Sequence, residues 1–234
     1  MAPKLLYLVA GARPNFMKLA PLVRALEARR DVFDYRIVHT GQHYDREMSD
    51  VFFEELAIPK PDHHLGAGGG THAQQTARVM VAFEQLCEQF RPDAVVVVGD
   101  VNSTLACSVV AKKLWIPVAH VEAGLRSGDL TMPEEINRLV TDAISDWFFV
   151  TEPSGEENLL REGKPRSRVH HVGHVMVDNL LYQCRILATR QLSSGPAADW
   201  RATNARYGVV TLHRPSNVDD ASTFRRIAGA LRRI

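Results

Sequence analysis

The sequence is poor in cysteine and has no long apolar run, and each scarcity excludes a class of protein. Its three cysteines, Cys87, Cys107 and Cys184, are odd in number and widely spaced. This spacing disfavours a disulfide framework or a zinc site and favours reduced, buried thiols in the cytoplasm. The apolar run near the amino terminus (KLLYLVA) is too short for the core of a signal peptide or for a membrane span. We therefore expect a cytoplasmic protein without a membrane partner.

Excess charge of one sign is also missing. The chain has 28 Lys and Arg against 27 Asp and Glu, a net charge of +1, so bulk electrostatics do not indicate a nucleic-acid partner. With 45% hydrophobic and 24% charged residues, the composition is that of a globular protein. A length of 234 residues suits one large domain or one and a half.

Histidine is plentiful, with ten residues, and raises the question of a metal. The densest group is His170, His171 and His174. Adjacent residues of a strand point to opposite faces, so His170 and His171 cannot easily share one ion. We expect no metal and no other cofactor.

Apolar segments of strand length alternate at short intervals with segments of helical periodicity. Expected strands cover residues 4–10, 35–38, 94–98, 117–121, 147–150 and 168–172. Expected helices cover residues 16–30, 44–56, 72–90, 102–115, 133–145 and 153–162, with Thr71, and Asn102 or Ser103, as N-caps. This alternation predicts an α/β fold with a doubly wound, mostly parallel, Rossmann-like sheet.

The chain predicts one complete domain and the start of another. Residues 1–174 form the expected N-terminal catalytic domain, and residues 175–205 a connecting helix and a polar linker. Residues 206–234 contain a strand at 207–212 and a helix at 221–234, which cannot bury a core alone. We interpret them as the first βα unit of an incomplete second domain, which the family resemblance described below implies is nucleotide-binding.

Carboxylates follow two of the expected central strands. Asp100 comes directly after AVVVVG, and Glu122 ends the stretch PVAHVE. Glu134 lies twelve residues further on, after a glycine-containing loop, where a helix opens. Ligands of open α/β sheets bind at the carboxyl ends of the strands. Asp100 is either a site residue or an acceptor for backbone N–H groups at a helix start.

Glu134 also has a purely structural interpretation. Thr131 and Glu134 match a capping box, and Glu134 and Arg138 are spaced for an i,i+4 ion pair. Glu122 follows a buried strand and matches no capping or helical ion-pair pattern, so spacing alone favours Glu122 as the functional carboxylate.

Basic side chains complete the candidate set. Arg13 and Lys18 lie at the first strand-to-helix turn, where a helix N-terminus and two cations suit a phosphate, although both could be surface charges. His213 ends the strand expected at 207–212 and would face the cleft between domains. Together the set fits acid–base chemistry on a phosphorylated small molecule.

Seven motifs then identify a family. In order they are GARPNFMKLAPL, TGQHYD, GDVNST, HVEAGLRSGD, MPEEINR, VGHVMVD and TLHRPSNVD. They resemble the non-hydrolysing UDP-N-acetylglucosamine 2-epimerases, and the resemblance spans nearly the whole chain. It implies the N-terminal half of a two-domain glycosyltransferase-B type fold.

The resemblance supplies the substrate and the reaction. It implies conversion of UDP-N-acetylglucosamine to UDP-N-acetylmannosamine through 2-acetamidoglucal, by elimination and re-addition of UDP, with no redox cofactor. The implied catalytic residues are Asp100, Glu122, Glu134 and His213, and the implied substrate-binding residues are Arg13, Lys18, Asp100, Glu122 and His213. A homodimer is the expected assembly.

Some features depart from the family pattern. In the family the second domain holds the uridine, so a chain of 234 residues should bind UDP poorly and turn over little. His174 stands where the family usually has Asn. TGQHYDREM is longer than the TAQHREM of many members, and because that loop contributes to the family's regulatory site, allosteric activation is left open. Two alternatives stay open: a hydrolysing 2-epimerase, whose first motif differs from Arg-Pro-Asn-Phe-Met, and a non-catalytic sugar-nucleotide-binding or interaction fragment.

Overall fold

The computed structural model describes residues 2–41, 53–189, 196–204, 206–212 and 215–233. The chain divides into two compact units, Met1–Arg185 and Ile186–Ile234. The expected functional boundary at residue 174 lies one helix before this division, and it stays a prediction.

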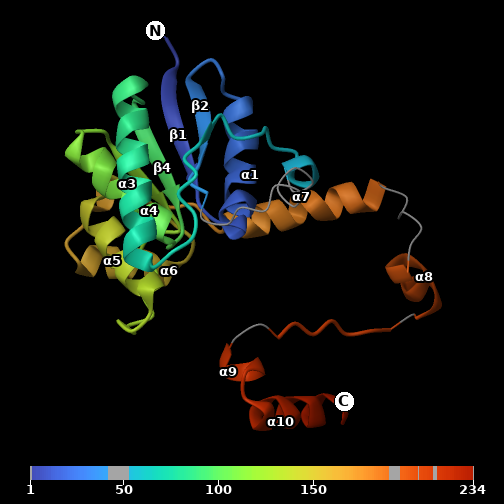
Figure 1. The fold of residues 1–234 in the computed structure, drawn as a ribbon. Helices are drawn as coiled ribbons and strands as arrows, with labels where there is room; N and C mark the ends of the chain where they lie inside the picture. The colour runs from blue at the N-terminus through green and yellow to red at the C-terminus, as the bar shows by residue number, and fades with distance from the viewer. Residues whose placement is uncertain (1, 42–52, 190–195, 205, 213–214, 234) are drawn as a thin grey trace. The chain divides into compact units, whose positions relative to one another are not determined.

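The first unit is built on a seven-stranded parallel sheet with the order β3-β2-β1-β4-β5-β6-β7 (Figure 1). Its strands are β1 (Lys4–Ala10), β2 (Phe33–His39), β3 (His63–His64), β4 (Ala94–Val98), β5 (Val118–Val121), β6 (Trp147–Val150) and β7 (Val169–His171). The helices are α1 (Arg13–Glu27), α3 (His72–Gln89), α4 (Asn102–Lys113), α5 (Pro133–Ile144), α6 (Pro153–Arg161) and α7 (Val175–Thr189), and a 3-10 turn covers Arg166–Arg168. The predicted doubly wound parallel sheet is confirmed.

Both faces of the sheet are covered, which explains why the central strand β4 is apolar throughout rather than alternating. Tyr7 and Val9 of β1 pack into a core with α3 and α4, whereas Leu8 and Ala10 pack into a second core with α1. Figure 1 shows α3 and α4 on one side of the sheet and α1 on the other. Arg24 of α1 donates to Asn179 of α7 at 3.1 Å and so anchors α7 beside α1.

Helix starts agree in part with the predicted caps. The Thr71 side chain accepts a hydrogen bond from the backbone of Gln74, as predicted. The N-cap of α4 is Val101, so the predicted caps Asn102 and Ser103 are wrong. Their side chains are engaged elsewhere, Asn102 with Gln75 at 2.7 Å and Ser103 with Thr40 at 2.7 Å.

Other differences concern short or peripheral segments. The stretch between residues 60 and 70, where no strand is expected, contains β3, which pairs with the end of β2. Residues 53–56 are helical as expected, while the rest of the predicted helix 44–56 and most of the motif TGQHYD lie outside the described residues. Cys87 and Cys107 are free and buried, but Cys184 is free and exposed, contrary to expectation.

The second unit contains α8 (Pro196–Thr203), α9 (Pro215–Val218) and α10 (Ala221–Leu231). Helix α8 replaces much of the expected polar linker. The strand predicted at 207–212 does not form, because no described segment pairs with it; Val209 and Val210 are 79% and 57% exposed. No helix in the described ranges is long and apolar enough to cross a membrane.

Candidate functional site

The predicted site residues of the first unit gather at the carboxyl edge of the sheet. After β1 the chain leads toward β2 and β3, whereas from β4 it continues in the opposite direction to β5, β6 and β7. The point between β1 and β4 is therefore a topological switch, where open α/β sheets bind ligands. Residues Gly11–Lys18 follow β1 and Gly99–Asp100 follow β4, so both turns flank this point.

Asn15 fixes the turn between β1 and α1. Its Oδ1 accepts hydrogen bonds from the backbone N–H groups of Gly11, at 3.3 Å, and Ala12, at 2.9 Å. Its Nδ2 donates to the carbonyl of Val98 at 3.1 Å, which ties the turn to the end of β4. Sequence reasoning did not single out Asn15, although its place in the motif GARPN was a signal. Arg13 begins α1, but its side chain is not among those described.

Lys18 and Glu122 form an ion pair at the switch point. Lys18 Nζ lies 2.7 Å from Glu122 Oε2, and both side chains are only 13% exposed. Glu122 has a φ of 72°, the left-handed region that non-glycine residues seldom adopt. Strain of this kind persists where the surroundings fix it, as they do in binding sites. The structure thus brings the predicted residues Lys18 and Glu122 together.

Gly99 makes room for this pair. It has a φ of +67°, and a Cβ added to it would lie 2.8 Å from Lys18 Nζ. A side chain at this position would displace the ammonium group. In the motif GDVNST, the glycine therefore leaves space for the Lys18 ammonium group, and the next residue is the candidate carboxylate Asp100.

Asp100 is held by α5 rather than by the start of α4. Its Oδ2 accepts a hydrogen bond from Arg138 Nε at 3.0 Å, and its backbone carbonyl accepts one from Asn137 Nδ2 at 2.8 Å. The structural interpretation of Asp100 as a helix-start acceptor is not what the structure shows. Its side chain is 26% exposed, which leaves the carboxylate open to a ligand.

The two glutamates of the motif MPEEINR differ from the prediction in their exposure and in their partners. Glu134 is exposed, and Arg138 pairs with Glu135 and Asp100 instead. The predicted i,i+4 ion pair between Glu134 and Arg138 is therefore wrong. Glu135 is only 1% exposed and also accepts hydrogen bonds from the backbone of Ser127 and Gly128 at 3.0 Å, which hold it in place as the partner of Arg138. Burial alone would raise the pKa of Glu135, but these hydrogen bonds and Arg138 outweigh it and lower that pKa.

The predicted capping box is also wrong. The N-cap of α5 is Met132, which makes no side-chain hydrogen bond to the helix, while Thr131 bonds to Asp129 at 2.6 Å. Pro133 does begin the helix, as expected. Glu134 lies exposed in the first turn of α5, the helix whose Arg138 bonds to Asp100.

A buried histidine lies at the end of β2. His39 is 3% exposed, stacks on Phe16 at 5.2 Å between ring centroids, and its Nδ1 has no hydrogen-bond partner among the residues described. Burial, with a smaller contribution from His64, lowers the pKa of His39 to about 4. Its ring is therefore neutral near pH 7.

His213 lies outside the described residues, so its predicted place in a cleft stays a prediction. Across the described part of the chain, no three His, Cys, Asp or Glu side chains form a group that could hold a metal ion. The charged groups described at this edge are the carboxylates of Glu122 and Asp100, beside the ammonium group of Lys18 and the guanidinium group of Arg138.

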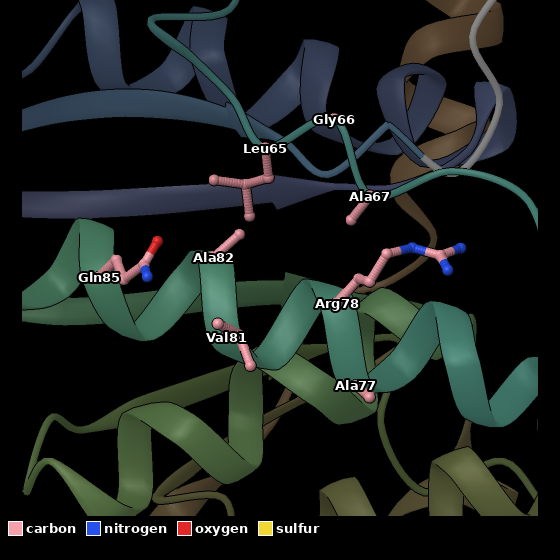
Figure 2. A pocket seen from close by; sticks show the side chains of 8 residues that line it. All are labelled: Leu65, Gly66, Ala67, Ala77, Arg78, Val81, Ala82 and Gln85. Carbon is pink, nitrogen blue, oxygen red and sulfur yellow. The ribbon is translucent and has the colours of Figure 1, made fainter.

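A separate pocket lies between the loop 65–67 and α3 (Figure 2). Its volume is about 400 Å³, and it contains none of the predicted site residues. Arg78 of α3 donates to the carbonyls of Gly68, at 3.0 Å, and Gly69, which ties the glycine-rich loop to the helix.

Comparison with known proteins identifies the family. A model of the UDP-N-acetylglucosamine 2-epimerase family matches residues 24–234. The chain is 42% identical to the UDP-N-acetylglucosamine 2-epimerase of Methanocaldococcus jannaschii over 95% of its own length and 60% of that protein. It is 41% identical to the UDP-2,3-diacetamido-2,3-dideoxy-D-glucuronate 2-epimerase of Pseudomonas aeruginosa, over 97% of its own length and 62% of that protein.

The structure agrees with these relatives. It superposes with a TM-score of 0.83 and 40% identity on the crystal structure of the Methanocaldococcus jannaschii UDP-GlcNAc 2-epimerase in complex with UDP-GlcNAc and UDP. The superposition covers 97% of this chain and 61% of that one. The chain therefore spans about 60% of the length of the relatives it matches. These neighbours confirm the predicted glycosyltransferase-B type fold, and the chain belongs to the UDP-N-acetylglucosamine 2-epimerase family.

Proposed function

We propose that the protein containing these residues epimerises UDP-N-acetylglucosamine at C2 to give UDP-N-acetylmannosamine, without a cofactor. The observation that carries the proposal is the Lys18–Glu122 pair beside Asp100, at the ends of the adjacent strands β5 and β4. It places carboxylates and a cation together at the switch point of the sheet. The similarity to 2-epimerases supports the same activity.

The residue types suit an elimination. As the bond between C1 and the diphosphate oxygen breaks, a base removes the C2 proton, UDP leaves, and a C1–C2 double bond forms in 2-acetamidoglucal. Cations near the leaving oxygen stabilise the departing diphosphate. Lys18 fills this role in our proposal, joined by Arg13 and His213.

The reverse step needs a second proton position. An acid delivers a proton to C2 from the opposite face, and the UDP oxygen re-forms its bond to C1. Inversion therefore requires acid–base groups on both faces of the sugar ring. Asp100, Glu122 and Glu134 come from three different elements, which favours such a two-sided arrangement.

Deuterium incorporation tests the reaction. The protein from the intact gene is incubated with UDP-N-acetylglucosamine in deuterated water, and the recovered sugar nucleotides are analysed by NMR and mass spectrometry. We expect deuterium at C2 and UDP-N-acetylmannosamine in the mixture. Recovery without deuterium at C2 would refute the proposal, and free N-acetylmannosamine as the main product would instead identify a hydrolysing 2-epimerase.

A second substrate is favoured by one observation, the 41% identity to the diacetamido-glucuronate 2-epimerase of Pseudomonas aeruginosa. That relative is almost as similar as the one from Methanocaldococcus jannaschii. Competition between the two UDP-sugars, read as the ratio of kcat/KM values, decides between them. Thermal stabilisation by a UDP-sugar without turnover would support the non-catalytic alternative.

We also propose a cytoplasmic homodimer. The free thiols Cys87 and Cys107 fit a reducing compartment. Exposed apolar side chains on the first unit, Val81 at 57%, Phe90 at 59% and Trp115 at 89%, offer surface for a second copy. Sedimentation equilibrium measures the assembly, and a monomer at micromolar concentration would contradict it.

A further inference from the structure

His120 occupies the most enclosed position near the site. It is the third residue of β5, its side chain is 0% exposed, and both of its ring nitrogens have partners. Nδ1 lies 2.6 Å from Asp142 Oδ1, and Nε2 lies 2.8 Å from the carbonyl oxygen of Gly99. None of the contacts described above uses this side chain.

The partners fix the orientation of the ring. A carbonyl oxygen can only accept, so Nε2 carries a proton. The other oxygen of Asp142 accepts from the backbone of Gly124, at 3.0 Å, and from Arg126 Nη1, at 2.7 Å. Burial alone would raise the pKa of Asp142, but His120 and Arg126 outweigh it and lower that pKa. Asp142 Oδ1 lies 2.6 Å from Nδ1, so the ring is hydrogen-bonded at both nitrogens.

Asp142 is itself held by a cation. Arg126 donates to Asp142 and also makes two hydrogen bonds to Glu162, at 2.8 and 2.7 Å. A buried carboxylate is stable only with such partners, so the acceptor of His120 is fixed in place.

The imidazole also connects three elements that carry candidate carboxylates. Gly99, which it binds, directly precedes Asp100 after β4. Glu122 follows His120 by two residues on the same chain segment, and Asp142 lies on α5, the helix that begins beside Glu134. One side chain thus bonds the β4 turn and α5 from its own place on β5.

We propose that His120 is a positioning residue, whose two hydrogen-bonded ring nitrogens set the relative placement of Asp100, Glu122 and Glu134. It touches no substrate; it acts through Gly99 and Asp142. The inference rests on the proposed function, because the positions matter only if these carboxylates exchange protons with C2. Small displacements of such groups cost much of the rate.

The hydrogen bond to Gly99 is tested first, without any activity assay. The chain is labelled with 15N-histidine, and the His120 signals are assigned by their loss in His120→Gln. We expect a slowly exchanging proton on Nε2, because that nitrogen is buried and donates to the Gly99 carbonyl. A rapidly exchanging Nε2 proton would overturn the proposed contact.

Two variants test the positioning role in the protein from the intact gene. His120→Leu removes both hydrogen bonds, whereas His120→Gln retains a donor that can reach the Gly99 carbonyl. We expect His120→Leu to lower kcat about 100-fold, with KM for UDP-N-acetylglucosamine changed by less than about threefold. Misplaced acid–base groups should also release more 2-acetamidoglucal and UDP per epimerised product. We expect kcat of His120→Gln to be about tenfold higher than that of His120→Leu.

Val79→Ala is the matched control, because Val79 is 0% exposed in the core beneath α3 and touches none of this network. It should lower the melting temperature without changing the ratio of released 2-acetamidoglucal to epimerised product. If His120→Leu does not fold, His120→Gln is compared with the control alone.

The outcomes separate the two proposals. An unmodified protein that introduces no deuterium at C2 refutes the proposed function. An active protein in which the His120 variants behave like Val79→Ala, with an unchanged product ratio, refutes the role of His120 alone.

Discussion

The ammonium group of Lys18 and the carboxylate of Glu122 form an ion pair of 2.7 Å that joins helix α1 to the end of strand β5. At 13% exposure each, the two groups are largely shielded from bulk water. The pair therefore holds a cation and a carboxylate together at the carboxyl edge of the sheet.

Replacing Lys18 with Met should reduce both stability and activity. The variant leaves the Glu122 carboxylate largely buried without its cation, which should cost about 2 kcal/mol of unfolding free energy. Activity should fall at least about 100-fold, because the cation near the leaving group is lost. Urea denaturation and the C2 deuterium assay measure the two effects.

Lys112→Met is the control for this prediction. Lys112 pairs with Asp146 at 2.8 Å, but its side chain is 33% exposed and belongs to the far end of α4. We expect a smaller loss of stability and unchanged activity. Equal losses of activity in both variants would show that Lys18 acts only through stability.

Gly99→Ala should damage activity more than stability. The alanine would have to keep the left-handed backbone conformation, at a cost of about 1 kcal/mol. Its Cβ would lie 2.8 Å from Lys18 Nζ. Because that nitrogen ends a flexible side chain, it can move aside, so the loss appears mainly in kcat. Gly163→Ala has a comparable φ of +83° with nothing within 4 Å, so it isolates the backbone cost. The prediction fails if both variants lose equal activity.

Sequence periodicity located the sheet because its strands are buried on both faces. The strand expected at 94–98 coincides with β4, and the carboxylate after it lies at the predicted edge. Such strands are apolar throughout, and glycine and proline mark their ends, so local signals suffice. The strand expected at 207–212 had a similar pattern but lacks a partner among the described residues, and pairing is not a local property.

The partners within the site depended on three-dimensional paths that no local pattern records. Lys18 reaches Glu122 because β1 and β5 both flank β4 in the sheet. Helical spacing predicted Glu134 as the partner of Arg138. The loop before α5 instead turns its backbone N–H groups onto Glu135, which draws that residue inward. Two adjacent glutamates are indistinguishable until this loop is placed.

This division of the two glutamates gives a third prediction. Glu135→Gln should lose about 2 kcal/mol of stability, because a buried charged acceptor of two backbone N–H groups and Arg138 becomes a neutral amide. Glu134→Gln should leave stability within about 0.5 kcal/mol but reduce activity at least about 100-fold. Thermal melting and the deuterium assay compare the pair. A Glu134→Gln variant with full activity would remove Glu134 from the site.

His39 gives a prediction for the dependence of stability on pH. Burial and His64 lower the pKa of His39 from 6.5 to about 4, so the folded protein holds this ring neutral while the unfolded chain protonates it below pH 6.5. The unfolded state therefore binds more protons between pH 6.5 and 4, and stability is lost as the pH falls through that window. The loss due to His39 should be on the order of 3 kcal/mol.

Replacing His39 with Leu isolates this contribution from the titration of carboxylates. The variant retains an apolar side chain against Phe16 but has no group that titrates near neutral pH. The free energy of unfolding in urea is measured for both proteins. The difference, variant minus unmodified protein, should become steadily more favourable to the variant from pH 7 to pH 4. Parallel pH profiles for the two proteins would mean that His39 titrates alike in the folded and unfolded states. Because His39 lies on β2, at the same carboxyl edge as Asn15, a neutral ring there also avoids adding positive charge beside the turn that begins α1.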